Sequence, residues 1–322
     1  MRRAAANAAY AGAAFLLAAC GDKGATTEPK TQCDVSLLVL GVAQDGGKPQ
    51  IGEPEDPAWA DESLRRDAAS LALIDRRDSP PKRWLFEATP DIRDELRRLD
   101  EAAPVEISVA LDGIFLTHAH IGHYAGLMFF GHESAGADHV PVYVMPRMAH
   151  FLETNGPWSQ LVRFENIYLA IMTADEAEIL AEGISVTPFV VPHRQEFSEV
   201  VGFRIKGPSK TAVFLPDIDS FEEWDAAGTK IEDVVASADI AFLDATFYAD
   251  GEIPGRDMSG FPHPFVSKTM ARFAPLAEGE KAKVRFIHMN HTNPLLDPHS
   301  AERREVLKAG FGIAEEGEEV CL

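Results

Sequence analysis

The chain has 322 residues, enough for one large domain or two of ordinary size. Hydrophobic residues make up 46% and charged residues 25%, so a sizeable folded core is expected. With 51 acidic and 30 basic residues, the chain has a formal net charge of −21. A negative field of this size repels phosphate backbones, so a small-molecule substrate is expected rather than a nucleic acid.

The N-terminus has the pattern of an export signal. A basic start is followed by an apolar run over 11–19, which is too short to anchor the chain across a bilayer. The run ends in Leu17-Ala18-Ala19-Cys20, which resembles the cleavage box of bacterial lipoproteins, in which the cysteine is acylated. The alternative is ordinary signal cleavage, with Cys20 incidental.

These features divide the chain into three parts. We expect a lipoprotein signal peptide at 1–19, an acylated Cys20 with a flexible tether over 20–34, and one folded domain over 35–322. The protein is then expected on the periplasmic side of the bacterial cell envelope, in contact with the membrane only through its N-terminal lipid. Oligomeric state stays open.

Short β-rich runs alternate with helical patterns in chain order. In the first half, β-branched and apolar runs predict strands, and apolar spacing on one side predicts helices. The expected strands lie at 35–42, 69–74, 83–87, 111–116 and 140–145, and the expected helices at 90–99 and 146–152.

The second half repeats this organisation. The expected strands lie at 184–191, 201–205, 211–215, 240–243 and 284–287, and the expected helices at 220–227, 231–237 and 264–273. Strands grouped within each half, with helices between them, predict an α+β layered domain rather than a doubly wound parallel sheet.

Two cysteines, Cys33 and Cys321, lie at the two ends of the expected domain. They could pair in an oxidising compartment, although spacing alone does not establish the bond. With so few cysteines, a thiolate zinc site is not expected.

Three histidines follow the strand expected at 111–116, in Thr117-His-Ala-His-Ile-Gly-His123. In an extended segment, His118 and His120 point the same way. If a helix begins next, His123 returns to that side three residues later. Three converging imidazoles form half of a metal site; the alternative is three hydrogen-bonded loop histidines.

This spacing resembles the H-x-H-x-D-H signature of the metallo-β-lactamase fold superfamily, with Gly122 in the place of the Asp. Further polar residues follow strand runs in the order of that superfamily: His193 after Val191, Asp217 after Leu215, and His291 after Ile287. The resemblance implies a four-layer αβ/βα sandwich.

A closer resemblance is to the coenzyme PQQ synthesis protein B family and its relatives, carried by residues 40–50, 191–194 and 288–294. The segment 242–247 fits that family and also resembles the tRNA 3′-processing ribonucleases. Two departures stand out. Members often have cysteines where this chain has Ile51-Gly52-Glu53, which puts a second, structural zinc in doubt, and the synthesis protein tends to have Asn at position 291.

The resemblance implies a ligand set. His118, His120 and His193 would bind a first metal, Asp217 would bridge to a second, and His123 and His291 would complete the second site. Zinc is the expected metal, as one or two ions, with iron or manganese as alternatives. With Gly122 in place of Asp, the second site should bind its ion more weakly.

Three further residues are assigned lesser roles around the ligands. Asp219 could replace Asp217, which is preferred because it comes first after the strand. His288 is expected to support a ligand, with terminal ligation as the alternative. Asp45, in a Gly-rich turn, either orients a ligand histidine or shapes the turn.

Two residues are candidates for proton transfer. His263 matches the place where the ribonuclease relatives have a proton-donating histidine. Asp244 is either a carboxylate in the metal cleft or a cap at the end of a strand. With Asp217 they form the proposed catalytic group.

The expected reaction is metal-assisted hydrolysis of an ester, lactone, amide or phosphodiester, in which a metal-bound water loses its proton and attacks. Two alternatives stay open: an iron-dependent oxidoreductase related to PQQ synthesis protein B, and a non-catalytic lipoprotein that binds a metal or a small molecule.

Overall fold

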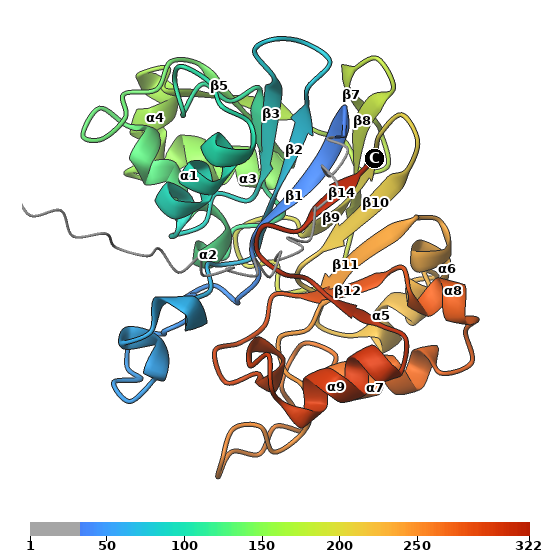
Figure 1. Cartoon of the computed structure of the whole chain (residues 1–322). Helices are drawn as coiled ribbons and strands as arrows, with labels where there is room; N and C mark the ends of the chain where they lie inside the picture. The colour runs from blue at the N-terminus through green and yellow to red at the C-terminus, as the bar shows by residue number, and fades with distance from the viewer. Residues whose placement is uncertain (1–32) are drawn as a thin grey trace, which may run out of the picture. The chain divides into compact units, whose positions relative to one another are not determined.

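Two seven-stranded sheets are stacked face to face, with helices on the outer side of each, in the computed structural model of residues 33–322 (Figure 1). The predicted signal peptide at 1–19, Cys20 and the tether up to residue 32 lie outside the described residues. Within 33–322, no helix has the length and apolar character needed to cross a membrane.

The first sheet combines the N-terminal strands with the last strand of the chain. In spatial order it consists of β14 (Glu319–Cys321), β1 (Val35–Gly41), β2 (Ser70–Asp75), β3 (Lys82–Phe86), β4 (Gly113–Phe115), β5 (Val140–Val144) and β6 (Ile167–Ile171).

The second sheet follows the remaining chain. Its spatial order is β13 (Gly312–Ile313), β12 (Val284–Ile287), β11 (Ile240–Asp244), β10 (Thr211–Leu215), β9 (Val201–Lys206), β8 (Ile184–Val190) and β7 (Glu178–Ala181). Strands β10, β11 and β12 run parallel, and β8 has the same direction because β9 is antiparallel to both β8 and β10.

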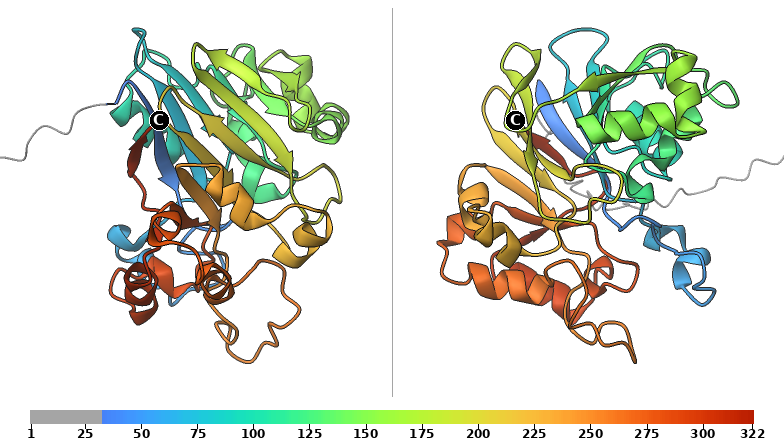
Figure 2. Two further views of the ribbon diagram at one scale, coloured as in Figure 1. Left: turned by 90° about the vertical axis from the view of Figure 1, so that its right-hand side faces the viewer. Right: turned by 180° about the vertical axis from the view of Figure 1, so that it is seen from behind.

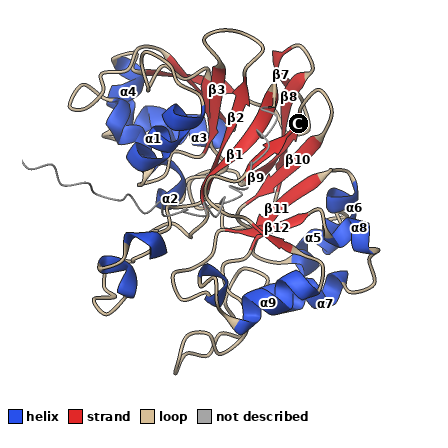
Figure 3. Cartoon of the chain, viewed as in Figure 1, coloured by secondary structure: helices blue, strands red, loops and turns tan. Residues whose placement is uncertain are grey.

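Helices cover the outer faces in two groups, as Figures 2 and 3 show. The first sheet carries α1 (Ile92–Ala102), α2 (Ile121–Tyr124), α3 (Pro146–Thr154) and α4 (Trp158–Arg163). The second carries α5 (Phe221–Ala226), α6 (Ile231–Ala236), α7 (Val266–Phe273), α8 (Glu278–Lys281) and α9 (Ala301–Lys308). Short 3-10 turns lie at η1 (Pro57–Trp59), η2 (Glu62–Leu64), η3 (Ala125–Phe130) and η4 (Pro294–Leu296).

Strand β1 explains why the apolar runs are continuous rather than alternating. Leu37 and Val39 point into the core between the sheets, whereas Leu38 and Leu40 point into the core under α1 and α3. Because successive side chains of a strand face opposite sides, a strand covered on both faces is apolar throughout. The predicted α+β sandwich is confirmed.

A disulfide joins the two ends of the described chain. Cys33 and Cys321 are bonded, with their Cα atoms 5.4 Å apart, within the usual range for such bonds. Cys321 belongs to β14, which pairs antiparallel with β1. The pairing that the sequence left open is therefore present in the structure.

A half-buried charge cluster ties α1 to the loops that flank the first sheet. The Arg98 guanidinium lies 2.9 Å from Asp67 Oδ2 and 3.3 Å from Glu316 Oε2, and Glu316 Oε1 accepts a hydrogen bond from the Asp67 amide. Burial outweighs the nearby Arg98 and raises the pKa of Glu316 to about 7.

Glu316 should make the folded protein less stable as the pH rises from about 5 to about 8. The folded carboxyl keeps its proton up to about pH 7, whereas in the unfolded chain it ionises near its ordinary value of 4.5. The folded state therefore binds more protons in this window, and the free energy of unfolding falls by at most about 1.4 kcal/mol per pH unit.

Urea unfolding at several pH values checks this prediction. Glu316→Gln should flatten the slope relative to the wild type. Glu315→Gln is the matched control, because the neighbouring Glu315 side chain is 67% exposed, and this variant should keep the wild-type slope. Equal slopes for Glu316→Gln and the wild type would contradict the prediction.

Candidate metal centre

The polar side chains of the candidate site come from loops at the carboxyl ends of strands. His118 follows β4, His193 follows β8, Asp217 follows β10, and His288 comes directly after β12. Because β8, β10, β11 and β12 share one direction, their carboxyl ends meet at one edge of the sheet. The side chains therefore gather at one end of the sandwich.

The first group consists of His118, His120 and His193, whose nearest ring nitrogens all lie within 4.8 Å of one another. His193 Nε2 is 3.1 Å from His120 Nδ1, and His118 Nε2 is 3.4 Å from Asp217 Oδ2. This is the set that the sequence placed around a first metal.

The second group surrounds His123. Its Nε2 lies 2.9 Å from Asp217 Oδ2 and 3.2 Å from Asp45 Oδ1, and His288 Nε2 lies 3.5 Å from the same Asp45 oxygen. Asp217 thus borders both groups, with Oδ2 between His118 and His123.

The outer nitrogens of these histidines lie close to polar atoms of other side chains. His118 Nδ1 is 2.8 Å from Thr117 Oγ1, His193 Nδ1 is 2.8 Å from Asp219 Oδ1, His123 Nδ1 is 3.3 Å from Glu87 Oε1, and His288 Nδ1 is 3.1 Å from Thr246 Oγ1. Such contacts orient an imidazole so that its opposite nitrogen faces the metal. In each case that opposite nitrogen is the one turned into the cluster.

The donor set fits a divalent metal. Seven buried atoms of the described residues at this point have no hydrogen-bond partner: Nε2 of His118, His123 and His288, Nδ1 of His123 and His193, and Oδ1 of Asp45 and Asp219. A buried polar atom without a partner is costly, and cations among the three Nε2 atoms and Asp45 Oδ1, which face into the cluster, would satisfy those four. Imidazole nitrogens combined with carboxylate oxygens suit zinc, iron or manganese.

Burial and charge set the protonation of the ligands. Burial and the neighbouring imidazoles hold the pKa of His118 well below its usual value, which leaves the ring neutral. Burial raises the pKa of Asp217, but the surrounding histidines lower it by more, so that the pKa lies well below its usual value. The same balance, with His123 and His288 as partners, lowers the pKa of Asp45. The neutral His118 ring and the ionised Asp217 and Asp45 carboxylates are forms that bind metals. Burial lowers the pKa of His123, but Glu87, Asp217 and Asp45 raise it by more, so this ring would release a proton on binding a metal.

The cluster reaches solvent at His120 and Asp219, and also at Asp45, whose side chain is 42% exposed. The His120 side chain is 24% exposed and that of Asp219 21%, whereas His118, His123, His193 and Asp217 are buried. A substrate can therefore approach from the side of His120.

The structure does not bring His291 to the cluster. His288 lies in the position that the sequence prediction assigned to His291. His291 Nδ1 hydrogen-bonds Asn290 Oδ1 at 2.9 Å, and its Nε2 lies 3.9 Å from Glu53 Oε1. The reason is local. His288 has a left-handed backbone with φ of 64°, which turns its ring toward Thr246 and Asp45 as soon as β12 ends.

Asp219 and Asp217 have different surroundings. Asp219 contacts His193 on the nitrogen that faces away from His120, which is an orienting position. Asp217 lies between His118 and His123, in the position expected of a bridging carboxylate.

His263 and Asp244 form a pair beside Asp217. His263 Nδ1 lies 2.7 Å from Asp244 Oδ2 and 3.4 Å from Asp217 Oδ1. Burial lowers the pKa of His263, but the two carboxylates raise it by more, to about 9. Asp244 also accepts hydrogen bonds from the amides of Ile218 and Thr246, so it both caps the end of its strand and holds His263.

Glu87 is a residue of the site that the sequence prediction missed. It is fully buried after β3, has a φ of 82°, and contacts Thr117 and His123 Nδ1. An acid that ends an otherwise apolar strand next to the histidine-bearing strand β4 was the available signal.

Glu87→Gln should weaken metal binding at His123 by about 10- to 100-fold, because the carboxylate fixes the ring and raises the basicity of its other nitrogen. Zinc titration against a competing chelator measures this. Glu95→Gln is the matched control, since Glu95 is an equally buried acid that hydrogen-bonds Thr89 instead of a histidine. Wild-type zinc affinity in Glu87→Gln would contradict the orienting role.

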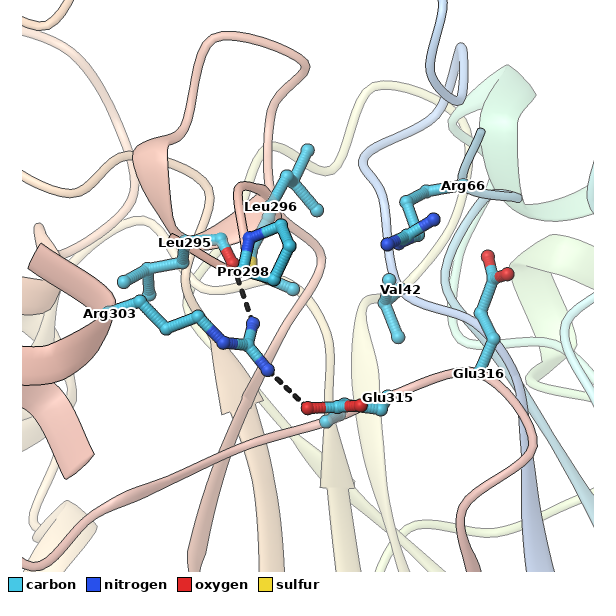
Figure 4. Close-up of a pocket in the computed structure, with 10 residues that line it drawn as sticks. Val42, Arg66, Leu295, Leu296, Pro298, Arg303, Glu315 and Glu316 are labelled. Atoms are coloured by element: carbon cyan, nitrogen blue, oxygen red, sulfur yellow. Dashed lines mark hydrogen bonds and ion pairs between the residues drawn. The ribbon is translucent and has the colours of Figure 1, made fainter. Parts of the chain in front are cut away.

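A separate cavity of about 230 Å³ lies behind the loops that carry Asp45 and His288 (Figure 4). Val42, Met289 and Leu295 are among its apolar lining, and Arg303 closes one side by contacts with Leu295 O and Glu315. None of the clustered histidines lines it, so it is distinct from the candidate metal centre.

Comparisons with known proteins agree with this geometry. The family model described as β-lactamase superfamily domain matches residues 82–294. Coenzyme PQQ synthesis protein B of Xanthomonas oryzae pv. oryzae is 26% identical over 316 residues, covering 89% of this chain and 99% of that protein. The protein of that name from Gluconobacter oxydans is 25% identical over 313 residues, covering 88% and 97%.

Solved structures show the same fold. Zinc-bound PqqB from Methylobacterium extorquens has a TM-score of 0.71 at 23% identity, covering 89% of this chain and all of that one. A diphosphatase of the PhnP family has a TM-score of 0.61 at 22% identity, covering 89% and 98%. The family match spans well over half of the chain. The chain therefore belongs to the β-lactamase superfamily, with the metallo-β-lactamase fold.

Proposed function

We propose that the protein is a metal-dependent hydrolase that holds two divalent ions and cleaves a small ester, lactone, amide or phosphodiester. Zinc is the metal that we propose for both ions. The observation that carries the proposal is the convergence of two histidine groups on Asp217, with His263 beside it. When bound, divalent ions lower the pKa of a water molecule and polarise the bond to be cleaved.

The residues of this chain have separate tasks in that reaction. His118, His120 and His193 would hold the first ion, and His123 and His288 the second. Asp217 lies between the two groups and would contribute its carboxylate to both. His263 keeps a proton near Asp217 and donates it to the leaving group, while Asp244 holds the His263 ring in position.

The fold neighbours support the hydrolase class. One neighbour is described as a diphosphatase, and human tRNase Z, short form, has the same fold with a TM-score of 0.52 at 16% identity. The zinc-bound PqqB neighbour supports zinc as the metal. The net charge of −21 argues against long nucleic acids and for a small substrate.

The proposal is tested on protein produced without added zinc, by metal analysis followed by a hydrolase screen. Bis(p-nitrophenyl) phosphate, an aryl ester, a lactone and a thioester cover the substrate classes. We expect two ions per chain and turnover of at least one class, both reduced in His118→Ala and His193→Ala. Full metal content in both variants would rule out the ligand set.

A second candidate is an iron-dependent oxidoreductase, favoured by the similarity to PQQ synthesis protein B along 89% of the chain. The same metal analysis separates it from the hydrolase. Iron as the native metal, with oxygen consumption and no hydrolysis, would favour this candidate.

We also propose an oxidising compartment, the bacterial cell envelope, as the site of action. The disulfide between Cys33 and Cys321 supports this location, because such bonds persist outside the reducing cytosol. Mass spectrometry of the mature protein would test the lipid at Cys20, which an unmodified N-terminus would contradict.

A further inference from the structure

We infer that Asp45 is a metal ligand that supplies, from the turn after β1, the carboxylate that the signature of the superfamily carries at position 122. The inference rests on the metal centre proposed above and concerns the second ion only. It replaces the sequence expectations that Asp45 orients a histidine and that Gly122 leaves the second site weak.

The space around Gly122 is already filled by Asp45. A Cβ atom on Gly122 would lie 2.6 Å from both Cα and Cβ of Asp45, and closer still to Oδ1. Real Cβ atoms do not approach other heavy atoms so closely, so only glycine fits here. The volume that a side chain at position 122 would occupy thus contains a carboxylate from another part of the chain.

The Asp45 carboxylate faces the nitrogens that are free to bind a metal. Its Oδ1 lies 3.2 Å from His123 Nε2 and 3.5 Å from His288 Nε2. All three atoms are buried and lack a hydrogen-bond partner among the described residues. The Asp45 side chain is 42% exposed as a whole, but Oδ1 is its buried end.

An orienting role does not fit this geometry. A residue that orients a ligand histidine contacts the nitrogen facing away from the metal. In His123 that nitrogen lies 3.3 Å from Glu87 Oε1, and in His288 it lies 3.1 Å from Thr246 Oγ1. Asp45 instead faces the inner nitrogen of both rings. A ring nitrogen that binds a metal carries no proton, so it cannot also donate a hydrogen bond to the Asp45 carboxylate. The remaining role for Oδ1 is to share the ion.

The backbone holds Asp45 in register with His288. Ala43 forms a parallel bridge with Met289, the residue after His288, and the Gln44 amide donates to Met289 O at 2.8 Å. The turn after Asp45 closes with the Gly47 amide donating to Gln44 O at 2.9 Å. Two ligands far apart in sequence are therefore fixed relative to each other before any ion binds.

The second ion would then have two imidazoles, from His123 and His288, and two carboxylates, from Asp45 and Asp217. The first ion would have three imidazoles and only the shared Asp217 carboxylate. An additional negative charge strengthens binding of a divalent cation, so the second ion is expected to bind as a stoichiometric component. Oxygen-rich sites also accept manganese or iron more readily than sites dominated by nitrogen.

The test compares zinc binding by four proteins: wild type, Asp45→Asn, Gly122→Asp, and Asp45→Gly combined with Gly122→Asp. Metal content after dialysis against zinc and competition with a chelator give stoichiometry and affinity, and circular dichroism checks folding. Asn is isosteric with Asp, so Asp45→Asn keeps the shape of the turn and removes only the charge.

We expect two zinc ions in the wild type, and in Asp45→Asn one ion with the second weakened by about 100-fold or more. This exceeds the 10- to 100-fold typical of an orienting residue. Gly122→Asp alone should unfold more easily, because Asp45 fills its space. The double variant moves the carboxylate to position 122 and should regain the second ion.

Three results would overturn the inference. Asp45→Asn that binds both ions with wild-type affinity would show that Asp45 is no ligand. If the wild type binds only one ion, the second site does not exist and Asp45 is not its ligand, whereas the proposal of a hydrolase with a single metal ion still holds. A wild type without zinc at either position would overturn the proposed metal centre as well.

Discussion

Asp217→Ala should release both metal ions and reduce hydrolysis by roughly 10³-fold or more. Asp217 Oδ2 lies 2.9 Å from His123 Nε2 and 3.4 Å from His118 Nε2, so one side chain serves both groups. The several kcal/mol of transition-state stabilisation that bound metals supply would be lost together. Metal analysis and turnover of the best substrate from the screen measure the two effects.

Asp219→Ala is the control for Asp217→Ala. It removes only the partner of the His193 outer nitrogen, and should lower affinity for the first ion by about 10- to 100-fold while the second ion stays. If Asp217→Ala retains both ions, the bridging role is incorrect.

His263→Ala should keep both ions and lower kcat by about 10²- to 10⁴-fold, the usual contribution of a positioned proton donor. His263 is buried beside Asp217, and Asp244 and Asp217 raise its pKa to about 9. A protonated donor is present below that pKa and lost above it. Wild-type activity should therefore decline at high pH, and this decline should be absent in His263→Ala.

The leaving group separates proton donation from a structural role of His263. A substrate that releases p-nitrophenol needs little protonation, so the loss of kcat should be small for it and large for a substrate that releases an alkoxide. Asp244→Asn should show the same dependence on the leaving group with a smaller effect, because it weakens the hold on the His263 ring without removing the ring itself. An equal loss for both leaving groups would contradict proton donation.

Local periodicity in the sequence predicts the layered α+β class and the common direction of His118 and His120, whereas the four-layer sandwich is what the family resemblance implies. Successive apolar residues of β1 reveal a strand covered on both faces, and His118 and His120 share a side because they are two apart in an extended segment. His193 and Asp217 each follow closely on a strand, and their assignment as ligands comes from the resemblance to the superfamily.

The remaining features depend on contacts that no local pattern carries. Whether His288 or His291 faces the cluster is decided by the left-handed backbone of His288. The relation between Asp45 and Gly122 depends on the packing of the turn after β1 against α2. The role of Glu87 follows from the pairing of β3 with β4, which brings it beside Thr117 and His123.

The central claim is that distant side chains hold two ions at one end of the sandwich. A crystal structure of zinc-loaded protein, with anomalous data collected at the zinc edge, tests it directly. Two peaks are expected, one about 2.0–2.2 Å from nitrogens of His118, His120 and His193, the other at that distance from His123, His288 and Asp45, with Asp217 contacting both. Peaks only at other sites, or a second ion held by His291 instead of His288 and Asp45, would contradict the account.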